Sequence, residues 1–119
     1  MSITWIAPDF AVSPQLRPTD LPEVAAAGYC AIVNNRPDGE APGQPSSHTI
    51  EAAARQLDLD YAYIPIVPGA PMDEAARRLD RFLREAGGPV LAFCRSGRRS
   101  AALWTMLQAR RGNAGAASP

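Results

Sequence analysis

The sequence contains no lysine, and all 12 of its basic residues are arginine. A chain without lysine has no side chain for a Schiff base and no lysine for a Walker-type phosphate loop, so both chemistries are excluded. Twelve acidic residues balance the arginines, and the net charge is zero. This balance gives no general attraction to nucleic acid or to a membrane surface, so we expect neither of them as a partner. Any anion should be bound by a local group of residues.

Cysteine and histidine are also scarce, with only Cys30, Cys94 and His48. So few ligands do not support a zinc site, and we expect no metal and no cofactor. The sequence shows no signal peptide and no apolar run long enough to span a bilayer, which favours a cytoplasmic protein with reduced thiols. We expect Cys30 in the core and His48 on the surface, and we leave open whether the two cysteines pair.

The order of elements predicts an α/β protein. Expected strands cover residues 3–6, 10–13, 29–34, 61–66 and 89–93, and expected helices begin after 19–20 and span 47–57, 73–85 and 101–107. This alternation predicts three layers, α/β/α, around a mainly parallel sheet whose ligands bind at the carboxyl ends of the strands. We expect one domain over residues 1–111 and a disordered tail over residues 112–119.

The strongest functional feature is the segment CRSGRRS, from Cys94 to Ser100. It follows an apolar strand and precedes a helix, so its thiol lies at a helix N-terminus. Unpaired backbone N–H groups and the helix dipole favour a thiolate and bind anions at such a position. We interpret Cys94 as a nucleophile that faces an oxyanion, either phosphate or a sulfur species. The alternative is a buried, inert cysteine.

The other residues of this segment support that interpretation to different degrees. Arg99 is the best candidate for a bidentate contact with the oxyanion, because its guanidinium is a planar fork of donors. Ser100 either donates its hydroxyl to the thiolate or caps the helix, and Gly97 allows a positive φ or a close backbone approach. The remaining candidates for substrate binding are Arg95, Ser96 and Arg98. For Arg95 and Arg98 the alternative is a solvated charge with no contact to the substrate.

A second candidate region is the Pro- and Gly-rich segment 36–45, which is expected at the same sheet edge. Asp38 is a candidate general acid that would protonate a leaving oxygen. The alternative is a structural turn, because Pro-Asp-Gly is a turn sequence by itself. Arg36 either adds positive charge for substrate binding or pairs with Asp38 or Glu40.

Three segments together resemble the bacterial beta-lactamase-hydrolase-like phosphatase family, which is related to dual-specificity and tyrosine phosphatases. They are residues 33–46, 63–66 and 90–100, and the resemblance covers about residues 8–110. It implies a cysteine-dependent phosphatase that acts on phosphate monoesters, including phosphotyrosine or phosphoprotein, and binds phosphate or sulfate. Cys94 would attack phosphorus, Arg99 and the loop amides would hold the phosphate, and Ser100 would assist departure of the thiolate.

The sequence departs from the broader phosphatase pattern at two places. In tyrosine phosphatases the arginine would stand at the position of Ser100, and the residue before the nucleophile is usually histidine rather than Phe93. The shorter spacing is similar to that of rhodanese-type sulfurtransferases, so sulfur transfer through a Cys94 persulfide is the alternative function.

Residues 67–71, where dual-specificity phosphatases keep their acid, contain no carboxylate. Asp38 is then the substitute acid, or the protein is a non-catalytic phosphate-binding module. No pattern indicates an oligomeric state.

Overall fold

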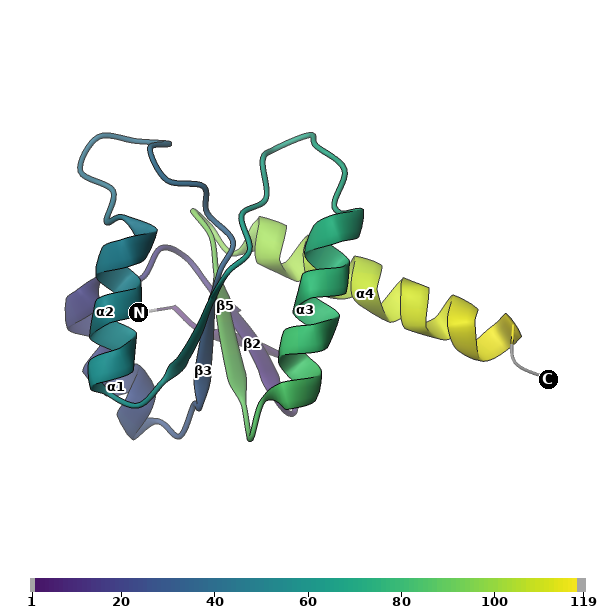
Figure 1. Ribbon diagram of the computed structural model, residues 1–119, viewed down its shortest axis with the longest axis horizontal. Coiled ribbons are helices and arrows are strands. Elements are labelled where there is room, and N and C mark those ends of the chain that lie inside the picture. Colours follow the sequence, from purple (N-terminus) through teal and green to yellow (C-terminus); the bar gives the residue numbers. More distant parts are fainter. Residues whose placement is uncertain (1, 118–119) are drawn as a thin grey trace.

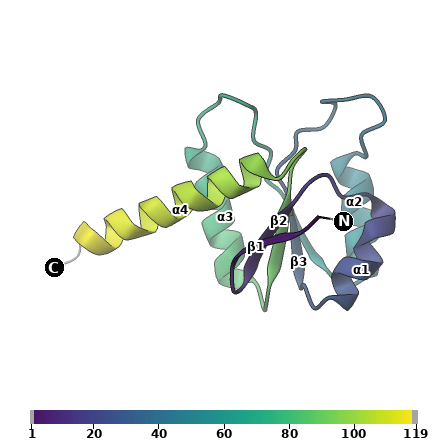
Figure 2. The same cartoon turned by 180° about the vertical axis from the view of Figure 1, so that it is seen from behind.

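The computed structural model describes residues 2–117, with the side chains of residues 2–112. Its centre is a five-stranded sheet with the order β1-β2-β5-β3-β4. The strands are β1 (Thr4–Ala7), β2 (Phe10–Ser13), β3 (Ala31–Asn34), β4 (Asp60–Tyr63) and β5 (Val90–Phe93). β2, β5, β3 and β4 are parallel, and β1 is antiparallel to β2 at one edge, as the view from behind in Figure 2 shows.

Helices cover both faces of this sheet, which confirms the predicted three-layer architecture (Figure 1). A 3₁₀ turn, η1 (Pro18–Asp20), leads into α1 (Leu21–Ala26), and α1 lies with α2 (Ser47–Gln56) on one face. The other face is covered by α3 (Asp73–Glu85) and α4 (Arg98–Ala117). Within the described residues, no helix combines the length and the apolar character needed to cross a membrane.

Alternation along the strands divides the core into two halves, because successive strand side chains point to opposite faces. On the face of α3 and α4, the buried strand residues are Phe10, Val12, Ala31, Val33, Val90 and Ala92. On the face of α1 and α2, they are Ala11, Ile32, Tyr61, Leu91 and Phe93. The strands are therefore apolar on both sides, as expected for a sheet between two helical layers.

The helix expected after residues 19–20 begins there, since α1 starts at Leu21 with Asp20 at its N-cap position. The carboxylate of Asp20 makes no cap hydrogen bond to α1, however, and accepts from the N–H of Arg17 at 2.8 Å, where the 3₁₀ turn η1 begins. Other boundaries differ from the sequence-based expectations. β4 ends at Tyr63 rather than at residue 66, although the N–H groups of Ile64 and Ile66 still donate to the carbonyls of Asn34 and Asn35, each at 2.9 Å. α4 continues through residues 112–117 of the expected tail, while 118–119 lie outside the described residues, so disorder of the tail stays a prediction.

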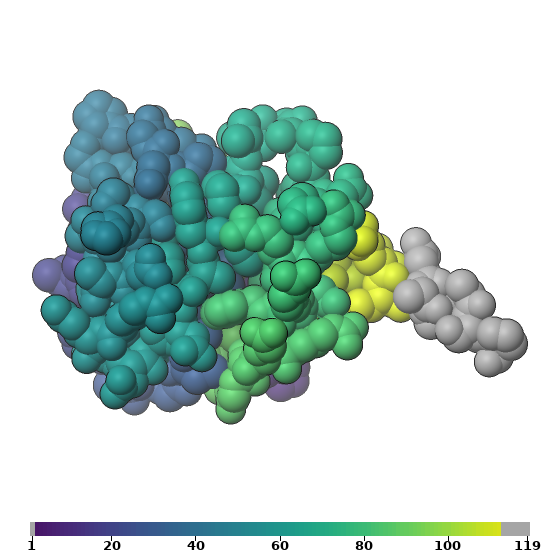
Figure 3. Space-filling model, in the orientation of Figure 1, coloured from purple at the N-terminus to yellow at the C-terminus, as the bar shows by residue number. Residues whose placement is uncertain are grey.

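The carboxyl ends of the four parallel strands meet at one edge of the sheet. Ser13 and Asn34 both pair with Phe93, and Asn34 also pairs with Tyr63. The segments that follow these strands therefore leave the sheet side by side. Figure 3 shows the two longest, residues 35–46 and 64–72, as separate ridges at the same end of the molecule. Residues from all four segments build the candidate site described next.

Candidate active site around Cys94

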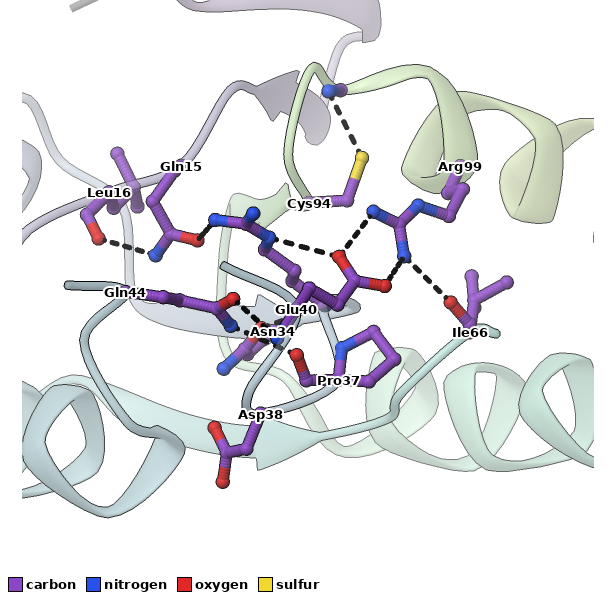
Figure 4. A network of polar contacts seen from close by, with 12 residues as sticks. Gln15, Leu16, Asn34, Pro37, Asp38, Glu40, Gln44, Ile66, Cys94 and Arg99 are labelled. Carbon is purple, nitrogen blue, oxygen red and sulfur yellow. Dashed lines mark hydrogen bonds and ion pairs between the residues drawn. The ribbon is translucent and has the colours of Figure 1, made fainter. Parts of the chain in front are cut away.

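Cys94 directly follows β5, the central strand, and its side chain is fully buried. Its backbone N–H donates to the carbonyl of Ser13 at 3.4 Å, which continues the pairing of β5 with β2. Its Sγ accepts a hydrogen bond from the N–H of Gly97 at 3.0 Å. The thiol therefore points into the turn that the following residues form, as Figure 4 shows.

Main-chain groups determine the ionisation of this thiol. Burial alone raises the pKa of Cys94, since a charge is less stable away from water. Hydrogen bonds from backbone N–H groups outweigh this effect and lower the pKa below its usual value; the donors are Ser100, Ser96, Arg99 and Gly97. A cluster of N–H groups at the start of a helix thus favours the thiolate, the reactive form of cysteine.

The turn is closed by a glycine at the position where a side chain would not fit well. Gly97 has a φ of +94°, and a Cβ at this position would lie 3.4 Å from the carbonyl carbon and oxygen of Ser13. Both properties predicted for Gly97, a positive φ and a close backbone approach, are therefore present. The Oγ of Ser96 accepts from the N–H of Arg98 at 3.3 Å, where α4 begins.

Arg99 contacts a carboxylate and lies near Cys94. Its Nη1 donates to Oε2 of Glu40 at 2.8 Å and to the carbonyl of Ile66 at 2.9 Å, and its Nη2 donates to Oε1 of Glu40 at 2.8 Å (Figure 4). The hydrogen bonds to Glu40 raise the pKa of Arg99, and the charge of Cys94 contributes to the same shift. The guanidinium is thus within electrostatic reach of the thiolate.

Arg36 is the second arginine of the site and is only 6% exposed. Its Nε donates to Oε1 of Glu40 at 3.0 Å, and its Nη1 donates to Oε1 of Gln15 at 3.1 Å. Of the partners considered from the sequence, it therefore pairs with Glu40 and not with Asp38. Glu40 is shared by both arginines, and their hydrogen bonds, that of Arg99 first, hold the pKa of its carboxyl below the usual value.

Asp38 is oriented away from the thiol (Figure 4). Its Oδ1 accepts from the N–H of Ser47 at 2.8 Å at the start of α2, and its own N–H donates to the hydroxyl of Tyr63 at 2.9 Å. These contacts agree with the structural alternative considered from the sequence, because a carboxylate at a helix N-terminus satisfies N–H groups that have no partner within the helix. A role of Asp38 as a general acid stays a prediction.

The hydroxyl of Ser100 differs from both expectations. α4 begins two residues earlier, so Ser100 is not its cap, and the Oγ donates to Oδ1 of Asn35 at 2.8 Å instead of to Cys94. Asn35 in turn donates its side-chain N–H to the carbonyl of Ile64 at 2.8 Å and its backbone N–H to the carbonyl of Phe93 at 2.8 Å. The backbone N–H of Ser100 is the group that contacts Cys94.

The side chains of the remaining residues singled out from the sequence do not contact Arg99, Glu40 or Arg36. Arg95 and Ser96 are exposed on the loop, Arg98 is exposed at the first residue of α4, and His48 is exposed on α2. Cys30 is half-buried and free, and it precedes β3 at the amino ends of the strands, whereas Cys94 follows β5 at their carboxyl ends. The length of a strand separates the two cysteines, and this distance excludes a disulfide between them. Among the described residues, no three potential metal-ligating side chains cluster.

Sequence reasoning missed three site residues: Gln15, Asn35 and Glu40. Asn34 and Asn35 directly follow an apolar strand, and both are buried. Two consecutive amides at the end of a buried strand are a pattern that predicts a polar network at the sheet edge. Glu40 lies four residues after Arg36, and this spacing allowed an ion pair between them to be considered. Nothing in the sequence indicated that Glu40 also pairs with Arg99. Nothing in the sequence pointed to Gln15.

Comparisons with known proteins identify the family of this chain. The chain matches the family described as beta-lactamase hydrolase-like protein, phosphatase-like domain, over residues 2–111. A beta-lactamase hydrolase-like protein of Agrobacterium fabrum is 41% identical over 91 residues, which is 76% of this chain and 21% of the relative. One from Xylella fastidiosa is 32% identical over 108 residues, or 91% of this chain and 25% of the relative. The chain thus spans a quarter or less of these relatives.

Solved structures share the fold. A phosphatase candidate from Neisseria meningitidis has a TM-score of 0.84 and 29% identity, covering 94% of this chain and 80% of its own. Another from Shewanella putrefaciens has a TM-score of 0.78 and 21% identity, covering 93% and 69%. Tk-PTP in its active form has a TM-score of 0.59 and 28% identity, covering 81% and 63%. The chain therefore belongs to the beta-lactamase hydrolase-like protein family and is its phosphatase-like domain.

Proposed function

We propose that this protein is a cysteine-dependent phosphatase that hydrolyses phosphate monoesters, with Cys94 as nucleophile. The observation that carries the proposal is the set of backbone N–H groups directed at the Cys94 thiol, which lower its pKa, with Arg99 beside it. The same N–H groups suit the oxygens of a phosphoryl group, whose charge grows in the transition state. Membership of the phosphatase-like family supports this chemistry.

The reaction would proceed in two steps. The thiolate attacks phosphorus, a sulfur–phosphorus bond forms, and the ester oxygen leaves with the electron pair of the broken phosphorus–oxygen bond and takes up a proton. Water then attacks the phosphocysteine, releases inorganic phosphate and restores the thiolate. Arg99 and the loop N–H groups would hold the phosphoryl oxygens in both steps. The exposed Arg95 and Arg98 would add a positive field that attracts the dianionic substrate.

The leaving group would depart without help from a side-chain acid. Asp38 contacts the start of α2, and two arginines keep Glu40 ionised. Substrates whose leaving oxygen is a weak base, such as aryl phosphates, should therefore react much faster than alkyl phosphates. This preference is compatible with phosphotyrosine as the substrate class.

The proposal is tested by comparing wild-type protein with Cys94→Ser on p-nitrophenyl phosphate. We expect turnover by the wild type and no measurable turnover by the variant, since the serine hydroxyl is not ionised at neutral pH. Acid quenching followed by mass spectrometry should find one phosphate on Cys94 and none on Cys30. Phosphate binding without turnover would show a non-catalytic binding module instead.

Sulfur transfer is the second candidate, favoured by the short spacing between Cys94 and Arg99 and by the 3.0 Å approach of Gly97 to the sulfur. A small turn of this kind suits a single transferable sulfur atom on the thiolate. Incubation with thiosulfate should then leave one added sulfur atom on Cys94, and cyanide should remove it as thiocyanate. Absence of this adduct in a protein that hydrolyses aryl phosphates would exclude the alternative.

A further inference from the structure

Glu40 has no role in the reaction as proposed, yet it makes the densest set of ionic contacts at the site. Its Oε1 accepts from Nε of Arg36 at 3.0 Å and from Nη2 of Arg99 at 2.8 Å, and its Oε2 accepts from Nη1 of Arg99 at 2.8 Å. The side chain is 21% exposed, and that of Arg36 is 7% exposed. One carboxylate therefore joins two guanidinium groups that come from different segments of the chain.

The contacts with Glu40 and Ile66 leave one edge of the Arg99 guanidinium without an oxygen partner. Both Nη1 protons are used, one by Glu40 and one by the carbonyl of Ile66, and Nη2 uses one proton for Glu40. Nε and the second Nη2 proton form no hydrogen bond to a carboxylate or carbonyl of the described residues. These two protons are parallel donors on one edge of the plane, which is the geometry that binds two oxygens of a phosphate.

Arg36 is arranged in a similar way. Its Nε and Nη1 are used by Glu40 and Gln15, while its Nη2 has no hydrogen-bond partner among the described residues. Solvent reaches this Nη2, since no buried side-chain nitrogen or oxygen of the described residues lacks a hydrogen-bond partner, and the donor is therefore open to an anion. Two arginines this close also repel each other, and the charge of Glu40 between them offsets the repulsion.

We propose that Glu40 is a positioning residue, which holds Arg99 and Arg36 as a pair of oxyanion ligands beside Cys94. The inference rests on the proposed phosphatase function, because it assigns the phosphoryl group of the substrate to the two arginines. Glu40 itself does not touch the substrate. It fixes the direction of the free guanidinium edge of Arg99 and keeps Arg36 next to it.

The test compares Glu40→Gln with the matched control Glu51→Gln. Glu51 makes the same kind of contact with Arg55, at 2.8 and 3.0 Å, but on the exposed side of α2. Binding of inorganic phosphate is measured by calorimetry, and kcat and KM are measured with p-nitrophenyl phosphate. We expect Glu40→Gln to weaken phosphate binding and to lower kcat/KM, each by about 10- to 100-fold. Glu51→Gln should leave both within about twofold of wild type.

A double-mutant cycle separates positioning from a general structural effect. If Glu40 acts through Arg99 and Arg36, adding Glu40→Gln to Arg99→Ala should weaken phosphate binding by a clearly smaller factor than it does in the wild type, because only Arg36 is then left for Glu40 to position. Glu40→Asp keeps the charge but is one methylene shorter, so it should give an intermediate loss and show partial rescue relative to Glu40→Gln. If thermal unfolding shows that Glu40→Gln does not fold, Glu40→Asp replaces it in the comparison of phosphate binding and kcat/KM.

Opposite results would overturn the inference. Tighter phosphate binding by Glu40→Gln would show that the carboxylate competes with the anion for Arg99, and unchanged binding and kcat would show that it does not position the arginines. A full additional loss in the Arg99→Ala background would also contradict the proposal, as would a wild-type protein that does not bind phosphate. Phosphate binding by a wild type without turnover would instead refute only the phosphatase function, and the binding measurements would still decide the role of Glu40.

Discussion

At the scale of single residues, the reactivity of Cys94 depends on the main chain more than on side chains. The groups that lower its pKa are backbone N–H groups of the turn and of the first residues of α4. Substitution of the exposed Arg95 or Arg98 leaves these groups in place. The lowered pKa of the Cys94 thiol is therefore a property of the loop conformation, and it depends on the turn that Gly97 allows.

A first prediction concerns the ionisation of this residue. Titration of the thiolate by ultraviolet absorbance, as the difference between wild type and Cys94→Ser, should show ionisation below about pH 8.5, the value of an unperturbed cysteine. Because the pKa is lowered on folding, the thiolate stabilises the folded protein above the pKa of the unfolded chain. This contribution is lost as the pH falls through the lower pKa of the folded protein.

The same titration can be checked by unfolding. The stability of wild type relative to Cys94→Ser, measured in urea at several pH values, should increase as the pH rises through this window. A relative stability that is constant or decreases with pH would contradict the lowered pKa. Cys30 is present in both proteins, so its contribution cancels in the comparison.

At the scale of elements, the segment between β3 and α2 is held by contacts to its neighbours. Gln44 accepts from the N–H of Glu40 at 3.1 Å and donates to the carbonyl of Pro37 at 2.9 Å. Ser46 caps α2 by accepting from the N–H of Thr49 at 3.1 Å, and Asp38 accepts from the N–H of Ser47 at its first residue. These contacts give the loop that carries Glu40 one defined path.

A second prediction follows for Asp38. Asp38→Ala should destabilise the protein by about 1 kcal/mol, as loss of a helix cap does, and Ser46→Ala should have a similar effect as the matched control. Urea unfolding measures both. Turnover of p-nitrophenyl phosphate and of phenyl phosphate should change by the same factor in Asp38→Asn. A loss confined to phenyl phosphate, whose leaving group is the stronger base, would identify Asp38 as a general acid instead.

At the scale of the whole molecule, Asn35 ties together three of the segments that meet at the carboxyl edge of the sheet. It contacts the segment after β4 through Ile64, the end of β5 through Phe93, and α4 through Ser100. All of these groups are buried. The relative position of Glu40, Ile66 and Arg99 therefore depends on a residue that does not contact the nucleophile.

A third prediction tests this role. Asn35→Ala should lower the free energy of unfolding by about 1–3 kcal/mol for each buried partner left unsatisfied, as measured in urea. Ser100→Ala should cost less, because it leaves only Oδ1 of Asn35 without its donor. The double variant should be more stable than the sum of the single effects predicts, since both remove the same hydrogen bond. Strict additivity would show that the contact at 2.8 Å contributes nothing.

Much of the architecture follows from local patterns. Apolar runs such as 90–93 predict buried parallel strands, the spacing of Leu79 and Ala76 predicts the inner face of α3, and Ser46 predicts the start of α2. These elements depend on residues close in sequence, and their boundaries agree with the structure. Cys94 and Gly97 belong to this group, because a strand, a glycine turn and a helix within a few residues already define a cradle of N–H groups.

What the sequence could not determine is which distant side chains reach that cradle. Glu40 and Arg99 are separated by 59 positions, and their contact exists only because β3 and β5 pair in parallel register and end at the same edge. The same register places Asn35 against Ser100, and it directs Asp38 to α2 and away from Cys94. The sequence by itself thus determined the place of the Cys94 thiol and its turn, through short-range geometry. The tertiary structure alone decided the partners of the arginines, because long-range strand pairing chooses among carboxylates that are chemically alike.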